Sequence, residues 1–330
     1  MPSGAPTPLP EEKIGRLALS CPASVRTQSF DGQPVPVAFG LPMATGGQAP
    51  VTVGCTLEPG HGFAIGTTQV SCSASDALRQ TASCAFRVTV LDPPRLSATR
   101  FLAFGDSLTS GWVSSPTSQA RPEPTSAYPY LLERDLQSRY VTQMIEVINA
   151  GAAGEDARDA VARFRSEIGS QRPEVIMLMQ GTNDLNPITG GGVDVAARAL
   201  EAMVIHGRNS GADVLLMTVP PSLRPGVDER VSPLNRAIRS IAARRGAGLI
   251  DVHGVVWHGS CPGGGTIPCI GADGLHPTAD GYRLIAEEVA RIVVERYDVE
   301  ILPADGNQAA ASQPPGILGF GMSLPRGGRQ

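Results

Sequence analysis

Residues 101–109 read FLAFGDSLT and carry much of the information about the fold and chemistry of this chain. The apolar residues 101–104 are typical of a buried strand, and Ser107 follows closely behind them. A second run, DGLHP at residues 273–277, places Asp273 and His276 three positions apart before a helical pattern. A serine hydroxyl is a poor nucleophile until a base takes its proton, and that base works best when a carboxylate fixes its tautomer. We therefore predict that Ser107, His276 and Asp273 act together.

Strand and helix patterns alternate after residue 100. Apolar runs predict strands at 101–104, 145–149, 175–179, 214–219 and 249–252. Helical patterns lie near 128–139, 156–169, 193–209, 231–245 and 279–297. This alternation is typical of an α/β domain in which helices cover both faces of a parallel sheet. Because ligands bind at the carboxyl ends of such strands, we expect the residues that follow them to converge at one edge. These residues are Ser107, Gly154, Asn183 and His276.

Four short blocks occur in order along this part of the chain. They read GDSL at 105–108, NAGAAG at 149–154, GTND at 181–184 and DGLHP at 273–277. With these blocks, residues 98–300 resemble the GDSL, or SGNH, superfamily of serine hydrolases. The resemblance implies a three-layer, flavodoxin-like α/β domain that hydrolyses esters and needs neither metal nor cofactor.

The resemblance also implies a role for individual residues. Ser107 matches the nucleophile, His276 the base, and Asp273 the acid that orients the base. The oxyanion hole is implied to consist of the backbone N–H groups of Ser107 and Gly154 and the side-chain amide of Asn183. Such donors stabilise the negative charge that develops on the ester oxygen in the transition state.

Simpler explanations remain open for several of these residues. Ser107 could be only the N-cap of a helix, and Asn183 only a turn former. Gly154 could be present only for backbone freedom, with Gly151 supplying the oxyanion donor instead. Candidate walls of the substrate pocket are the loop aromatics Trp112 and Trp257 and the loops 114–125 and 186–192.

Residues 17–92 have a different pattern, in which short alternating runs are separated by Gly, Pro, Asp and Ser. This pattern predicts a small antiparallel β-sandwich. The segment and its four cysteines resemble the hyalin repeat, an extracellular module of immunoglobulin-like fold whose role in that family is usually adhesion or spacing. Asp92-Pro93-Pro94 ends the module, because prolines cannot continue a central strand.

Six cysteines make an even set without zinc-type spacing. Structural disulfides in an oxidising compartment are one interpretation, and six free thiols are the alternative. In a sandwich of the hyalin-repeat kind the first and last strands lie near each other, which favours pairing Cys21 with Cys84. We expect Cys55 to pair with Cys72 inside that loop. The remaining pair would join Cys261 to Cys269 across the Gly- and Pro-rich residues 262–268.

Composition limits the remaining possibilities. A net charge of −4 gives no reason to expect a nucleic-acid partner. No stretch of about 18 apolar residues is present, so we expect no transmembrane segment. The chain begins without the apolar core of an export signal, and we expect an exported protein whose signal was removed.

Together these patterns predict a flexible segment at 1–15, a hyalin-repeat-like sandwich at 16–94, a hydrolase domain at 95–302 and a flexible tail at 303–330. The predicted function is that of a secreted serine carboxylesterase acting on short-chain acyl esters, either small molecules or carbohydrate-linked. Carbohydrate acetylesterases and lipases or lysophospholipases of the same superfamily are alternatives. An adhesion or carbohydrate-binding protein with a non-catalytic hydrolase scaffold is an alternative of another class. For the N-terminal module we consider contact with a surface or with the catalytic domain.

Overall fold

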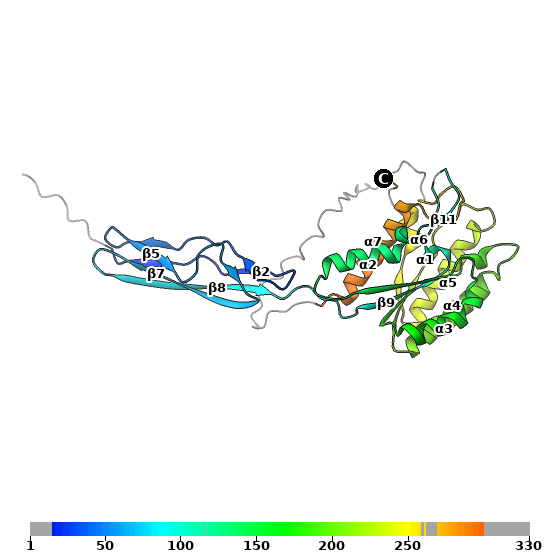
Figure 1. The fold of residues 1–330 in the computed structure, drawn as a ribbon, viewed down its shortest axis with the longest axis horizontal. Coiled ribbons are helices and arrows are strands. Elements are labelled where there is room, and N and C mark those ends of the chain that lie inside the picture. Colours follow the sequence, from blue (N-terminus) through cyan, green and yellow to red (C-terminus); the bar gives the residue numbers. More distant parts are fainter. Residues whose placement is uncertain (1–14, 116, 259–260, 262–268, 300–330) are drawn as a thin grey trace, which may run out of the picture. The chain divides into compact units, whose positions relative to one another are not determined.

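The structure is a computed structural model that describes residues 15–299 apart from 116, 259–260 and 262–268. It contains a β-rich N-terminal module and an α/β domain (Figure 1). The predicted flexible segments at 1–15 and 303–330 lie outside the described residues, except for Gly15. The predicted loop 262–268 also lies outside them.

The N-terminal module is built from short strands around a small apolar core. Its strands are β1 (Ala18–Ser20), β2 (Val25–Gln28), β3 (Val35–Pro36), β4 (Met43–Thr45), β5 (Thr52–Cys55), β6 (Gly62–Phe63), β7 (Gly66–Ser75) and β8 (Thr81–Leu91). A four-stranded sheet has the order β2-β8-β7-β5, and β1 pairs with β4 and β3 with β6. Alternate residues of β7 and β8, among them Val70, Phe86 and Val88, are buried in the core. The prediction of an all-antiparallel module was wrong at one point, because β2 runs parallel to β8.

All six cysteines are paired as predicted, which excludes the free-thiol alternative. The bonds join Cys21 to Cys84, Cys55 to Cys72 and Cys261 to Cys269. Cys55 and Cys72 face each other in the register of β5 and β7.

The α/β domain has a five-stranded parallel sheet of order β12-β9-β13-β14-β15. These strands are β9 (Arg100–Gly105), β12 (Glu146–Gly151), β13 (Val175–Met179), β14 (Asp213–Met217) and β15 (Gly248–Ile250). The central strand β13 is buried along its whole length, as expected of a sheet covered on both faces. The predicted parallel sheet is therefore confirmed.

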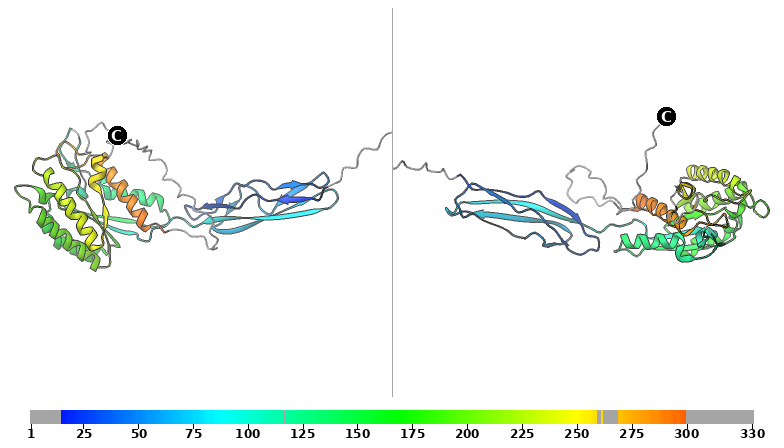
Figure 2. Two further views of the ribbon diagram at one scale, coloured as in Figure 1. Left: turned by 180° about the vertical axis from the view of Figure 1, so that it is seen from behind. Right: turned by 90° about the horizontal axis from the view of Figure 1, so that it is seen from above.

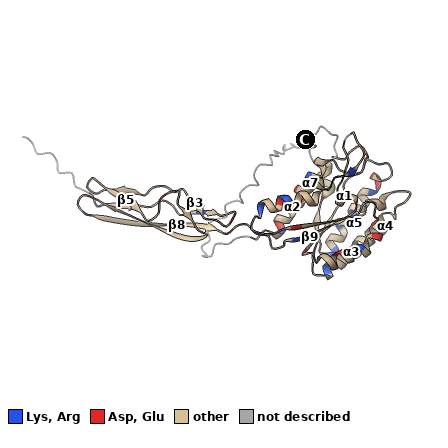
Figure 3. Cartoon of the chain, viewed as in Figure 1, with Lys and Arg blue, Asp and Glu red and all other residues tan. Residues whose placement is uncertain are grey.

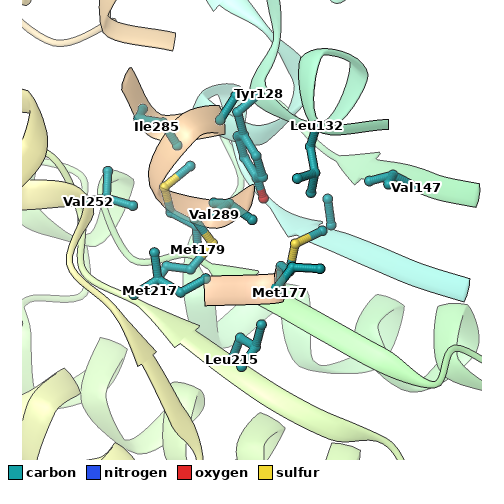
Figure 4. Packing of buried hydrophobic residues seen from close by; sticks show 14 of the residues in the cluster. Tyr128, Leu132, Val147, Met177, Met179, Leu215, Met217, Val252, Ile285 and Val289 are labelled. Atoms are coloured by element: carbon teal, nitrogen blue, oxygen red, sulfur yellow. The ribbon is translucent and has the colours of Figure 1, made fainter. Parts of the chain in front are cut away.

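Helices form a layer on each face of this sheet (Figure 2). The long helices are α2 (Tyr128–Arg139), α3 (Ala157–Gln171), α4 (Val193–Asn209), α5 (Asp228–Arg245) and α7 (Ala279–Tyr297). One core cluster packs Tyr128 and Leu132 of α2 and Ile285 of α7 against Met177 and Leu215 of the sheet (Figure 4). A second cluster packs α3, α4 and α5 against the opposite face. This arrangement confirms the three-layer prediction.

Several short elements were absent from the prediction. They are α1 (Ser107–Ser110), α6 (Val252–His258), the hairpin of β10 (Trp112–Val113) and β11 (Arg121–Pro122), and the 3-10 turns η1 (Pro124–Ser126) and η2 (Asn183–Leu185). Trp112 and Trp257, predicted in loops, lie in β10 and α6 instead. Two to seven residues carry too little periodicity to identify such elements from sequence.

Acidic and basic residues both occur on the helices of the α/β domain (Figure 3). Many are paired, as Arg291 of α7 is with Glu288 and Glu295. Within the described part of the chain, no helix has the length and apolar character needed to cross a membrane.

Candidate active site

Ser107 lies at the carboxyl end of β9, where the strand turns into α1. The carboxylate of Asp106 caps this helix by accepting the N–H of Leu108 at 2.9 Å. A side chain at Gly105 would collide with the carbonyl oxygen of Met179, so only glycine fits there. Ser107 is the first residue of this helix, and Asp106 is its N-cap. A capping role therefore does not explain the serine at position 107.

His276 faces Ser107 across the edge of the sheet. Its Nε2 lies 2.9 Å from Oγ of Ser107, and both residues are buried. An isolated β-bridge between Ile270 and Pro277 holds the segment that carries His276. The N–H of Gly271 also donates to the carbonyl oxygen of His276 at 3.0 Å. Helix α6 lies between β15 and the segment that carries His276.

Asp273 binds the other nitrogen of the same imidazole. Its Oδ2 lies 2.5 Å from Nδ1 of His276. Its Oδ1 accepts the N–H groups of Leu275 at 3.1 Å and His276 at 3.0 Å. Burial opposes ionisation of Asp273, but these hydrogen bonds outweigh it and lower the pKa of the carboxyl group. Because an ionised Asp273 can only accept a hydrogen bond, Nδ1 of His276 carries the ring proton. Nε2 is then unprotonated, and its lone pair faces the hydroxyl of Ser107.

Arg224 supports the Asp273 turn, and sequence analysis did not identify it. Its Nε donates to the carbonyl oxygen of Asp273 at 2.8 Å, and Nη2 donates to Oδ2 at 3.2 Å. The N–H of Leu223 donates to the carbonyl oxygen of Gly274 at 2.7 Å. A cavity of about 420 Å³ adjoins this turn and is lined by Arg224 and Asp273, but by neither Ser107 nor His276.

The connection from β12 to α3 contains both candidate oxyanion glycines. Gly151 is packed against the backbone of Ser110, and its N–H donates to Oδ1 of Asn149 at 3.0 Å. Gly154 has a φ of 81° and open space where a side chain would be. Its N–H has no acceptor among the described residues. Packing thus accounts for Gly151, whereas the oxyanion role of Gly154 stays a prediction.

Asn183 begins η2, just beyond the carboxyl end of β13. Its Nδ2 donates to the carbonyl oxygen of Glu155 at 3.1 Å, which ties it to the residue next to Gly154. The neighbouring Asp184 accepts the N–H of Ala157 at 2.7 Å. These hydrogen bonds therefore join the β12–α3 connection, which contains Gly154, to η2, which contains Asn183.

Two buried carboxyl groups lie beneath this edge. Burial, reinforced by the nearby charge of Asp184, raises the pKa of Asp106 to about 7. Burial also raises the pKa of Asp184 to about 6. Oδ2 of Asp106 is buried without a hydrogen-bond partner among the described residues. Both groups therefore retain protons at pH values where carboxyl groups are normally ionised.

The two tryptophans differ in their surroundings. The ring of Trp112 lies 6.0 Å from the imidazole of His276, measured between ring centres. Trp257 stacks on His253 within α6 instead. Trp112 is thus the aromatic residue beside the candidate base. Among the described residues, no group of three His, Cys, Asp or Glu side chains is arranged to hold a metal ion.

Residues 103–284 match the model of the GDSL-like lipase/acylhydrolase family. The chain belongs to this family. Residues 18–90 match the HYR domain, in agreement with the predicted hyalin repeat.

Solved structures of similar fold include an acylhydrolase and an esterase. A lipase/acylhydrolase from Enterococcus faecalis is 26% identical, with a TM-score of 0.50, over 62% of this chain and 98% of that one. The aryl esterase of M. smegmatis is 21% identical, with a TM-score of 0.50, over 60% of this chain and 99% of that one.

A curated relative, the uncharacterized lipoprotein YqeF of Bacillus subtilis, is 30% identical over 81 residues. That match covers 23% of this chain, and the chain spans only 33% of the relative's length.

Proposed function

We propose that this GDSL-family hydrolase is an exported serine carboxylesterase in which Ser107, His276 and Asp273 form the catalytic triad. The observation that carries the proposal is the unbroken hydrogen-bonded chain from Oγ of Ser107 through His276 to Asp273. The lowered pKa of Asp273 beside a buried imidazole supports the proposal, because shifted pKa values are frequent among the residues of active sites.

The proposed reaction begins when Oγ of Ser107 attacks the ester carbonyl carbon and Nε2 of His276 takes the hydroxyl proton. Asp273 stabilises the imidazolium that forms. The carbonyl oxygen becomes an oxyanion, which accepts hydrogen bonds from the N–H groups of Ser107 and Gly154 and from Nδ2 of Asn183. Collapse of this intermediate breaks the bond to the alcohol, and His276 protonates the departing oxygen. Water, deprotonated by His276, then releases the acid from Ser107.

Short acyl esters are the proposed substrates. Within the described residues, the segments between β9, β12 and β13 and the long helix that follows each strand contain only α1, the β10–β11 hairpin, η1 and η2 beyond irregular loops. None of these is an apolar helix that could cover a long acyl chain. Trp112 provides an aromatic wall next to His276.

Export and domain division belong to the same proposal. Three disulfides and a HYR domain are typical of proteins that work in an oxidising compartment. We propose that residues 16–94 and 95–302 fold as separate units, with the chemistry confined to the second.

A series of p-nitrophenyl esters from acetate to palmitate, together with an acetylated polysaccharide, tests the proposal. We expect kcat/KM to be highest for acetate or butyrate. A maximum at palmitate would indicate a lipase, and strong preference for the polysaccharide would indicate a carbohydrate acetylesterase. Absence of any hydrolysis would favour the adhesion function that the HYR family suggests.

A further inference from the structure

Arg163 of α3 connects the ends of two strands with the segment that carries Gly154. We propose that Arg163 and Glu155 form a positioning pair that fixes the three oxyanion donors relative to one another. This inference rests on the proposed function. Neither residue is placed in contact with the reacting atoms, so both are positioning residues.

The guanidinium of Arg163 contacts two backbone carbonyl oxygens, one carboxylate and one aromatic ring. Nη1 donates to the carbonyl oxygen of Ala150 at 2.7 Å, and Nη2 donates to that of Gly105 at 3.0 Å. Nε lies 3.0 and 3.1 Å from the two carboxylate oxygens of Glu155. The same guanidinium lies 4.0 Å from the ring centre of Phe104. Only 26% of the Arg163 side chain and 19% of the Glu155 side chain are exposed.

The contacts of this pair at Gly105 and Glu155 lie close in the chain to predicted oxyanion donors. Gly105 is two residues before Ser107, whose N–H is the first donor. Glu155 directly follows Gly154, whose N–H is the second. The carbonyl oxygen of Glu155 accepts Nδ2 of Asn183, the third donor. The carboxylate of Glu155 also accepts Nε2 of Gln180, the residue just after β13, at 3.3 Å. The pair therefore joins β9, β12 and β13 at the edge where all three donors lie.

Arginine is suited to this position because its planar guanidinium donates in several fixed directions at once. A lysine ammonium would keep the charge but could not reach both carbonyl oxygens and the carboxylate in that geometry. Without these contacts the donors would be free to shift. A displacement of about 1 Å costs on the order of 10²-fold in rate.

The competing explanation is an ion pair that only stabilises the fold. Three variants distinguish a positioning role from a purely stabilising ion pair: Arg163→Met, Arg163→Lys and Glu155→Gln. The matched control is Arg165→Met. Arg165 lies on the same helix and is exposed. We expect Arg163→Met to lower kcat by about 10²-fold on p-nitrophenyl acetate with little change in KM, whereas Arg165→Met stays near wild type. Arg163→Lys should recover only part of this loss, and Glu155→Gln should fall between Arg163→Met and wild type.

A double-mutant cycle with Asn183→Ala gives the sharper result. If Arg163 acts by holding the donors, Arg163→Lys should cost much less in a chain that already lacks the Asn183 amide. Equal losses with and without Asn183, or a lowered melting temperature with unchanged kcat, would overturn the positioning role.

Hydrogen–deuterium exchange separates failure of this inference from failure of the proposed function. A wild-type protein without esterase activity would overturn the function. Even in that case, we expect the Arg163–Glu155 pair to slow exchange at the backbone amides of residues 152–156. Faster exchange there in Arg163→Lys and Glu155→Gln, but not in Arg165→Met, supports the positioning role. Unchanged exchange in both variants would overturn it.

Discussion

Nε2 of His276 lies 2.9 Å from Oγ of Ser107, although 169 positions separate the two residues in the chain. Ser107 is placed by the end of the buried strand β9, and His276 by the bridged segment ahead of α7. Asp273 fixes the far side of the same imidazole. The hydroxyl proton therefore has an acceptor within hydrogen-bond reach, as general-base catalysis requires.

The variant Asn183→Ala distinguishes a catalytic role of the Asn183 side chain from a purely structural one. The ester oxygen is neutral in the ground state and gains near-full negative charge in the tetrahedral transition state, so the amide matters mainly there. We expect kcat to fall by about 10²- to 10³-fold with a much smaller change in KM. Turnover and melting temperature should be measured on the same preparation. A lowered melting temperature with normal turnover would leave Asn183 as a turn former only.

Asp106→Asn should change how stability depends on pH. Asp106 has its pKa raised from 3.8 to about 7 by burial, so between these values the folded protein holds a proton that the unfolded chain has lost. Its contribution to stability therefore decreases as pH rises from about 4 to about 7. Asparagine can still cap α1 but does not titrate.

Thermal melts at pH 5 and pH 8 check this expectation. The drop in melting temperature from pH 5 to pH 8 should be smaller in Asp106→Asn than in the wild type. Asp184 remains in both proteins and contributes in the same direction, so some drop is expected to persist. Identical drops in the two proteins would show that Asp106 is ionised throughout this range.

Alanine at three glycines should give three different results. At Gly151 the new methyl group would meet the backbone of Ser110, and such overpacking typically costs about 1–3 kcal/mol. At Gly154 there is space, and the cost is the positive φ, about 1–2 kcal/mol. At Gly169 in α3 nothing is near, so alanine should stabilise the helix by about 1 kcal/mol. Urea unfolding measures all three, and a tolerated Gly151→Ala would refute the packing explanation for that glycine.

Much of the α/β domain could be predicted from sequence because its buried strands and amphipathic helices are long enough to show their periods. The bounds of α2, α4 and α7 agree with the predicted 128–139, 193–209 and 279–297. The parallel pairing of β2 with β8 escaped prediction, because strand direction depends on distant chain segments.

The supporting residues of the site were harder to foresee. Ser107, Asn183 and His276 stand in recognisable blocks, whereas Arg163 and Arg224 make their contacts with distant backbone carbonyl oxygens. One local sign does exist for Arg163, which lies in α3 beside the buried Ala160 and Phe164. A charged residue next to such a buried stripe often has a specific partner.

Residues 95–330 alone should keep esterase activity. All the proposed catalytic groups lie between Ser107 and His276. A cut before Arg95 preserves the hydrogen bond from the N–H of Val299 to the carbonyl oxygen of Arg95. The truncated protein should show kcat/KM close to that of the full chain on p-nitrophenyl acetate. A folded, monodisperse fragment without activity would mean that the HYR module completes the site.

Hydrolysis of p-nitrophenyl acetate by Ser107→Ala, compared with the wild type at equal folded concentration, tests the central claim most directly. Ser107 supplies the atom that forms the acyl bond, so turnover should fall by at least about 10⁴-fold while the melting temperature stays near wild type. His276→Ala should behave similarly, and Asp273→Asn should lose less because its role is orientation. Wild-type turnover in a folded Ser107→Ala protein would contradict the proposed mechanism.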